Sequence, residues 1–226
     1  MSIYAISDLH LSFQTEKPMN KFGNIWADYE EKMKFQWNEI VDKNDIVLIP
    51  GDLSWATYLQ SAVQDFRFID ELNGLKIISK GNHDYWWETL NKLNVFLEDN
   101  GFLTIKFLHN TCFDAGEYVV CSAKGYDLTV EEKLRNRECI RLELSLKEGA
   151  KHGKKMIVML HYPPFGKNLE LFPDIKDILE KYGVDICIYG HLHAEGHKRC
   201  INENIDGVTY KLVSADFLNF APIKIA

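Results

Sequence analysis

The sequence lacks the features that carry a protein into or across a membrane. No apolar run among its 226 residues is long enough to span a bilayer, and no charged segment followed by an apolar segment opens the chain at Met1. The five cysteines are odd in number, and no Cys-x-x-Cys occurs. These absences favour a reducing compartment and free thiols, so we expect a cytoplasmic protein that does not bind membranes.

The sequence also lacks a basic segment. Its formal net charge is -7, and it contains no extended run of Lys and Arg. Polymeric nucleic acid and anionic membranes are bound through broad cationic surfaces, so we do not expect nucleic acid to be a partner. A small phosphorylated substrate stays compatible with this charge, because bound metal cations can invert the local field.

The remaining composition is that of a globular protein. Hydrophobic residues make up 46% of the chain and charged residues 26%, which is enough apolar material for a sizeable core. We find no internal repeat, low-complexity segment or linker. We therefore expect one domain over residues 1–226, while the sequence specifies no oligomeric state.

Apolar runs alternate with helical patterns in the first hundred residues. This order predicts parallel strands covered by helices. Strands are expected at 3–6, 45–49 and 75–79, and helices at 26–41, 58–72 and 85–98. The loop 11–24 leaves directly from Asp8-Leu9-His10, so we expect it to overhang any site at that point.

The second half of the chain has a different pattern. Short β-type runs at 103–108, 112–113 and 118–122 predict a second sheet, and Thr129 to Glu132 fits a capping box that opens a helix to about residue 148. Further along, the pattern predicts strands at 156–160 and 184–189, a helix at 174–182, and a hairpin of 196–201 with 208–214.

Residues of the types that bind metal ions directly follow five of the apolar runs. They are Asp8-Leu9-His10, Gly51-Asp52, Gly81-Asn82-His83-Asp84, His161, and Gly190-His191-Leu192-His193. Open α/β sheets collect ligand-binding groups at the carboxyl ends of their strands, and oxygen and imidazole ligands suit divalent transition metals. Asp8 and His10 can bind one ion if the first strand continues that far, because alternating residues of a strand share a face; His191 and His193 have the same spacing.

These five motifs, in this order, resemble the calcineurin-like metallophosphoesterase superfamily. The resemblance implies an α/β fold, a four-layer αββα sandwich of two central mixed sheets flanked by helices. It also implies two divalent metal ions, drawn from Mn, Fe, Zn, Co and Ni, roughly 3.5–4 Å apart. One ion is assigned to Asp8, His10, Asp52 and His193, and the other to Asn82, His161, His191 and the shared Asp52.

The resemblance further implies hydrolysis of a small phosphomonoester or phosphodiester. A hydroxide bridging the two metals attacks phosphorus, Asp52 bridges the metals, and Asn82 steadies the phosphoryl oxygens. His83 faces the leaving group and acts as general acid. Asp84 belongs to the motif, and we interpret it as a residue that pins its turn.

One departure from the superfamily pattern reduces the range of activities that we expect. Serine/threonine phosphatases of the superfamily extend the second motif with an Asp that orients the catalytic His and an Arg that grips phosphate. Here Leu53-Ser54-Trp55-Ala56-Thr57 contains neither, which argues against a phosphoprotein phosphatase and leaves the orientation of His83 open. The aromatic residues beside the ligands form either a wall for the leaving group or part of the core; they are Trp55, Tyr85, Trp86, Trp87 and Tyr162.

Two alternatives belong to other functional classes. A metal-dependent nuclease of the same superfamily would need a basic track for the strand, which the sequence does not show. A non-catalytic protein-interaction scaffold could lack some metal-binding residues or the catalytic histidine. Here every metal-ligand position of the motifs carries a ligand residue, and His83 is present, which weighs against this alternative.

Overall fold

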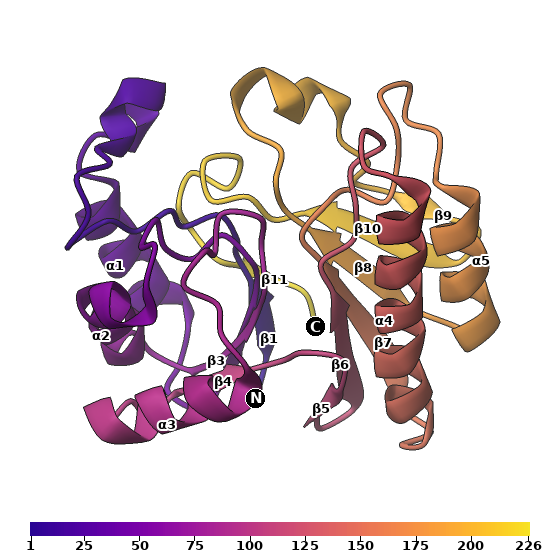
Figure 1. The fold of residues 1–226 in the computed structure, drawn as a ribbon, viewed down its shortest axis with the longest axis horizontal. Helices are drawn as coiled ribbons and strands as arrows, with labels where there is room; N and C mark the ends of the chain where they lie inside the picture. The colour runs from indigo at the N-terminus through magenta and orange to yellow at the C-terminus, as the bar shows by residue number, and fades with distance from the viewer.

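The first of two central sheets is built mainly from the first half of the chain. The computed structural model describes residues 1–226. The sheet has the spatial order β11 (Ile223–Lys224), β1 (Ile3–Ala5), β2 (Ile46–Pro50), β3 (Leu75–Ser79) and β4 (Ile105–Phe107). Strands β1 to β3 are parallel, as predicted, β4 continues the parallel order, and β11 adds an antiparallel edge. On its outer side lie α1 (Tyr29–Ile40), α2 (Val63–Glu71) and α3 (Leu90–Asn100), as Figure 1 shows.

The second sheet is built from the second half. Its order is β5 (Cys112–Ala115), β6 (Tyr118–Ala123), β7 (Lys155–Leu160), β8 (Ile186–Tyr189), β10 (Val208–Leu212) and β9 (Asn204–Ile205). The four inner strands are parallel, and β5 and β9 are antiparallel edges. Helices α4 (Glu132–Ala150) and α5 (Pro173–Tyr182) cover its outer face (Figure 1).

The core divides into layers that match this arrangement. Buried residues of both sheets, among them Leu48, Ile77 and Ile157, form the cluster between the sheets. On the outer side of the first sheet, Met33 and Trp37 of α1 are fully buried, so the aromatic stripe of this helix is core. Each such side chain contributes about 1.5–3 kcal/mol of burial. The predicted four-layer αββα sandwich of two mixed sheets is confirmed.

Two expected elements are placed differently. The run 103–108 belongs to the first sheet, since β4 pairs in parallel with β3 and Phe107 packs with Phe66 of α2 at 5.8 Å between ring centroids. The helix expected from residue 85 begins at Leu90, because Thr89 caps it and Trp86 is drawn into the core against Phe66.

Two further local predictions are wrong. No capping box opens α4: Glu131 is its N-cap without a side-chain bond, and the Thr129 N–H donates to Asp127 in a local turn. Residues 194–199 form a 3-10 helix, η4 (Ala194–Arg199), so the hairpin is shorter than expected and pairs β9 with β10. Competing local hydrogen bonds of this kind are not visible in hydrophobic periodicity.

The remaining short helices flank the edge where the motifs lie. They are η1 (Met19–Phe22), η2 (Asn24–Trp26) and η3 (Leu59–Ala62). All five cysteines are free thiols, as predicted. None of the helices combines the length and the apolar character that a membrane-spanning helix needs.

Candidate metal centre

Buried acids and imidazoles gather where the carboxyl ends of the strands of both sheets meet. Asp8 and Asp52 follow β1 and β2 and are at most 1% exposed. Asp52 Oδ2 lies 3.9 Å from His10 Nε2 and 3.5 Å from His161 Nε2, and Asp8 Oδ1 lies 3.6 Å from His193 Nε2. Two groups of ligand atoms therefore converge, Asp8 with His10 and His193, and Asp8 with Asp52 and His161.

The backbone reaches this arrangement by left-handed turns. Strand β1 ends at Ala5, so it does not continue to Asp8 and His10, and their convergence with His193 does not come from strand alternation. Their φ angles are 57° and 48°, and Asp52 and His191 have φ angles of 52° and 71°. Such conformations cost of order 1–3 kcal/mol each and persist only where the surrounding packing holds them, as functional sites commonly do.

The glycines of the motifs permit close approach between segments. A Cβ on Gly81 would overlap the backbone nitrogen and the carboxylate of Asp52. A Cβ on Gly190 would overlap the carboxylate of Asp8 and the hydroxyl of Ser7. The Gly before Asn82 and the Gly before His191 are therefore required by packing against the two acids.

Asp84 ties two motifs together. Its buried carboxylate accepts hydrogen bonds from the backbone nitrogens of Asp52 at 2.9 Å, Leu53 at 2.9 Å and Gly81 at 2.7 Å. Burial raises the pKa of Asp84 to about 6, although these N–H groups oppose the shift. The interpretation of Asp84 as a residue that pins its turn is confirmed.

Imidazole nitrogens and an amide oxygen face one another across the centre. His161 Nδ1 lies 3.0 Å from the carbonyl of Pro50, so we assign the proton to Nδ1, and Nε2 then turns a lone pair toward Asn82 Oδ1 at 2.6 Å. His10 Nε2 and His193 Nε2 lie 3.2 Å apart, and His10 Nδ1 is buried without a partner. Opposed lone pairs repel unless a proton or a cation lies near them, so this donor set fits divalent metal ions.

The electrostatics of the cluster lead to the same conclusion. Burial lowers the pKa of His10 and of His161 to about 3. Burial, followed by the charges of Asp84 and Asp8, raises the pKa of Asp52 to about 9. The metal-free site thus holds neutral His10 and His161 and a protonated Asp52. A divalent cation would supply the charge that lets Asp52 ionise.

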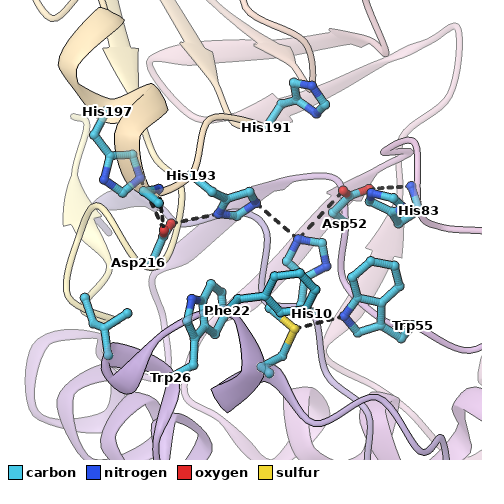
Figure 2. A pocket seen from close by; sticks show the side chains of 13 residues that line it. His10, Phe22, Trp26, Asp52, Trp55, His83, His191, His193, His197 and Asp216 are labelled. Carbon is cyan, nitrogen blue, oxygen red and sulfur yellow. Dashed lines mark hydrogen bonds and ion pairs between the residues drawn. The ribbon is translucent and has the colours of Figure 1, made fainter.

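His193 is held differently from the other imidazoles. Burial alone would lower its pKa, but hydrogen bonds to Asp216 and Asp8 and their charges raise the pKa to about 10. Its Nδ1 lies 2.9 Å from Asp216 Oδ1 (Figure 2), which turns Nε2 toward Asp8 and His10. Carboxylates in this position orient metal-binding histidines.

Asp216 is a residue that the sequence reasoning missed. It lies shortly after β10, the strand that pairs in parallel with β8, and is 6% exposed. The signal was available, because an acid after an apolar strand is the rule that found Asp8 and Asp52.

The structure brings together six of the seven predicted metal ligands, and His191 stands apart. The His191 ring packs against Tyr162 at 4.5 Å and His161 at 5.2 Å between centroids, and Figure 2 shows it away from the group of Asp52, His10 and His193. Its backbone N–H donates to Asp8 Oδ2 at 2.9 Å. The six that converge are Asp8, His10, Asp52, Asn82, His161 and His193.

His83, the predicted general acid, lies at the edge of this cluster. Its backbone N–H donates to Asp52 Oδ1 at 2.8 Å. Its ring packs on Trp55 at 4.5 Å between centroids, and Nδ1 lies 3.3 Å from the hydroxyl of Tyr85. Trp55 and Tyr85 therefore position the ring, in place of the acid found in the phosphoprotein phosphatases. Trp86, by contrast, is a core residue, 1% exposed.

An apolar pocket opens beside His83. Its volume is about 330 Å³, and the loop after His10 supplies Met19, Phe22, Ile25 and Trp26 to its wall. Figure 2 shows Phe22, Trp26 and Trp55 around it, and the Trp55 indole N–H donates to the sulfur of Met19 at 3.1 Å. The loop therefore overhangs the site, as predicted from its point of departure.

Comparison with solved structures shows the same fold in proteins of distant sequence. The protein of unknown function AQ665 from Aquifex aeolicus is 17% identical with a TM-score of 0.52, over 99% of this chain and 95% of that chain. Phosphopantetheinyl hydrolase (PptH) from Mycobacterium tuberculosis is 13% identical with a TM-score of 0.55, over the same shares. GAP50, the anchor in the inner membrane complex of Plasmodium, is 14% identical with a TM-score of 0.52, over 96% and 72%. At these identities the likeness shows the fold alone.

The sequence itself also matches a family. No protein of curated function matches the chain. The profile of the calcineurin-like phosphoesterases matches residues 1–195, the segment that carries all five motifs. With that match over most of its length, the chain belongs to the calcineurin-like phosphoesterase family.

Proposed function

We propose that this protein is a metal-dependent phosphohydrolase that cleaves a small phosphomonoester or phosphodiester. The observation that carries the proposal is the convergence of two buried carboxylates with three imidazoles and an amide oxygen. Family membership supports the reaction class, and this donor set supports the use of divalent metals.

We propose that Asp52 is shared between two metal ions. Asp8, His10, Asp52 and His193 would hold one, and Asn82, His161, His191 and Asp52 the other. The position of Asp52 Oδ2, within 4 Å of both His10 Nε2 and His161 Nε2, supports the sharing, because these histidines belong to different sets. His191 has the weakest support, since its ring packs against Tyr162.

The chain's own residues supply the remaining chemistry. When bound, two divalent cations supply a water of lowered pKa and neutralise the phosphoryl oxygens. His83 is proposed to donate a proton to the leaving-group oxygen, since it lies at the border between the cluster and the apolar pocket. Trp55 and Tyr85 hold its ring in place.

The pocket indicates which esters fit. Its lining combines six hydrophobic side chains with seven histidines and aspartates of the centre and its surroundings, and its volume is at the lower end of the range of about 300–1,000 Å³ for small-molecule sites. No Lys or Arg lines it. An ester with a compact apolar or aromatic group is therefore favoured over a polynucleotide, whose backbone needs a basic track.

The fold alone does not separate an enzyme from a scaffold, because one structural neighbour is named a hydrolase and another an anchor. The complete ligand set and the positioned His83 favour the enzyme.

A metal-reconstituted activity screen tests the proposal. Full-length protein loaded with Mn, Fe, Zn, Co or Ni is assayed with p-nitrophenyl phosphate, bis-p-nitrophenyl phosphate, nucleotides and cyclic nucleotides. We expect metal-dependent turnover that is lost in Asp52→Asn and kept in Asp206→Asn, an exposed acid paired with Lys176. Absence of turnover on every ester, with two ions bound per chain, would overturn the proposed activity.

A further inference from the structure

A second cavity lies at the same edge of the two sheets, on the side of β3 and β6. Its volume is about 180 Å³. Ser79 and Lys80 reach it from the end of β3, Lys124 from the end of β6, and Arg137 and Arg141 from α4. It shares no residue with the apolar pocket and includes none of the proposed metal ligands.

The cavity concentrates positive charge in an acidic protein. Four cationic side chains line it against one carboxylate, that of Glu138, so three positive charges are left uncompensated while the whole chain carries -7. Glu138 Oε1 lies 2.6 Å from Arg141 Nη1 and 3.7 Å from Arg137 Nε. Lys80 and Lys124 form no salt bridge. Folding alone gives no reason to bring these cations together, because like charges in one cavity repel.

A buried hydroxyl in the same cavity is left without a partner. Ser79 is 2% exposed, and its Oγ makes no hydrogen bond. Buried polar groups are nearly always paired, so an unpaired hydroxyl that lines a cavity points to a missing acceptor. Four cations line the same cavity, so an anion fits as this acceptor, and the carboxylate oxygen Glu138 Oε2 is also buried there without a partner.

We propose that this cavity binds a phosphate-type oxyanion. Guanidinium groups match the oxygens of such an anion in bidentate geometry, the two lysines add point charges, and Ser79 adds a neutral donor. The volume lies below the usual range of about 300–1,000 Å³ for whole ligands, so one anionic group fits and a cofactor or polymer does not.

The cavity adjoins the metal centre through the backbone. Lys80 directly precedes Gly81 and Asn82, and the carbonyl of Lys124 accepts the N–H of His161 at 3.1 Å. The oxyanion is therefore either a second anionic group of the substrate or a free anion, and both have the same chemistry.

Phosphate titration of the full-length protein tests the site without reference to hydrolysis. EDTA-treated protein is titrated with inorganic phosphate by calorimetry at constant ionic strength, so that binding to metals does not contribute. We expect one phosphate per chain, bound at least about 10-fold more weakly by Lys80→Gln/Lys124→Gln, because hydrogen bonds to charged groups are worth that much. The control Lys133→Gln/Lys147→Gln removes two exposed charges from α4 and should bind like wild type.

A second variant tests the site with a substitution that removes no contact of the fold. Ser79→Ala removes a hydroxyl that has no partner in the fold and should weaken phosphate binding about fivefold. Absence of binding by EDTA-treated wild type, or equal affinity in the lysine double variant, would overturn the proposal.

Steady-state kinetics distinguish the two sources of the oxyanion. This experiment rests on the proposed hydrolysis. Metal-loaded wild type and Lys80→Gln/Lys124→Gln are compared on a phosphomonoester and on the same ester carrying a second phosphate. A loss of kcat/KM of about 10-fold on the second ester alone assigns the site to the substrate. Unchanged kcat/KM on both esters, with phosphate binding kept in wild type, assigns it to a free anion.

Discussion

Replacing His83 with Ala separates proton donation from metal binding. The His83 side chain makes no contact with a carboxylate, and its link to Asp52 runs through the backbone N–H, which Ala retains. The fold loses the half-buried aromatic contact with Trp55, worth about 0.5–1.5 kcal/mol, and the contact with the hydroxyl of the exposed Tyr85. We therefore expect a stable variant that binds both metals, with turnover reduced by about 10²–10⁴-fold, or about 2.7–5.5 kcal/mol of barrier.

The loss should depend on the leaving group. A p-nitrophenolate leaves without a proton, whereas an alkoxide does not, so His83→Ala should reduce turnover of an alkyl phosphate more than turnover of p-nitrophenyl phosphate. The assay is kcat on both esters with metal content measured on the same samples. His152→Ala, which truncates an exposed histidine that pairs with Asp114 and does not line the pocket, is the control and should keep wild-type turnover. Equal losses on both esters would refute proton donation, and loss of a metal would refute the division between ligand and acid.

The metal centre and the net charge of the chain give the remaining predictions. Asp52→Asn should lose two-metal binding and hydrolysis but not thermal stability in EDTA, because burial raises the pKa of Asp52 to about 9 and the metal-free acid is already neutral at pH 7; a lower melting temperature in EDTA would contradict this. Metal affinity should rise with pH by up to about 100-fold per unit below pH 9, because metal binding must release two protons. One comes from Asp52, whose pKa burial raises to about 9. The other comes from His193, whose pKa burial lowers but Asp216 and Asp8 raise to about 10. Asp216→Asn should lower the number of protons released, measured by calorimetry in two buffers, and unchanged release would be evidence against the role of Asp216. Nucleic acid should bind weakly at physiological salt in a fluorescence titration, given the net charge of -7, whereas tight binding with a steep salt slope would favour the nuclease.

Much of the site was predictable from the sequence because parallel strands deliver their carboxyl ends to one edge. Asp8, Asp52 and His161 each follow a buried strand, and the sheets bring them within a few ångströms of the other ligands. The inner strands are buried on both faces, so they appear as continuous apolar runs and their ends are easily located.

Local geometry was harder to predict. The left-handed turns at Asp8 and His10 depend on contacts from Gly51 and Asp52, which lie far away in the sequence: the Asp8 N–H donates to the carbonyl of Gly51 and the His10 N–H to that of Asp52. The late start of α3 depends on the burial of Trp86 against Phe66 of another helix. Such tertiary contacts leave no trace in a periodicity of 3.6 or 2.

The most direct test of the account is anomalous diffraction from crystals of the full-length protein loaded with Mn. We expect two ions per chain, roughly 3.5–4 Å apart, with Asp52 contacting both. Asp8, His10 and His193 should bind one ion, and Asn82, His161 and His191 the other. A single ion, or two ions with Asp52 bound to neither, would contradict it.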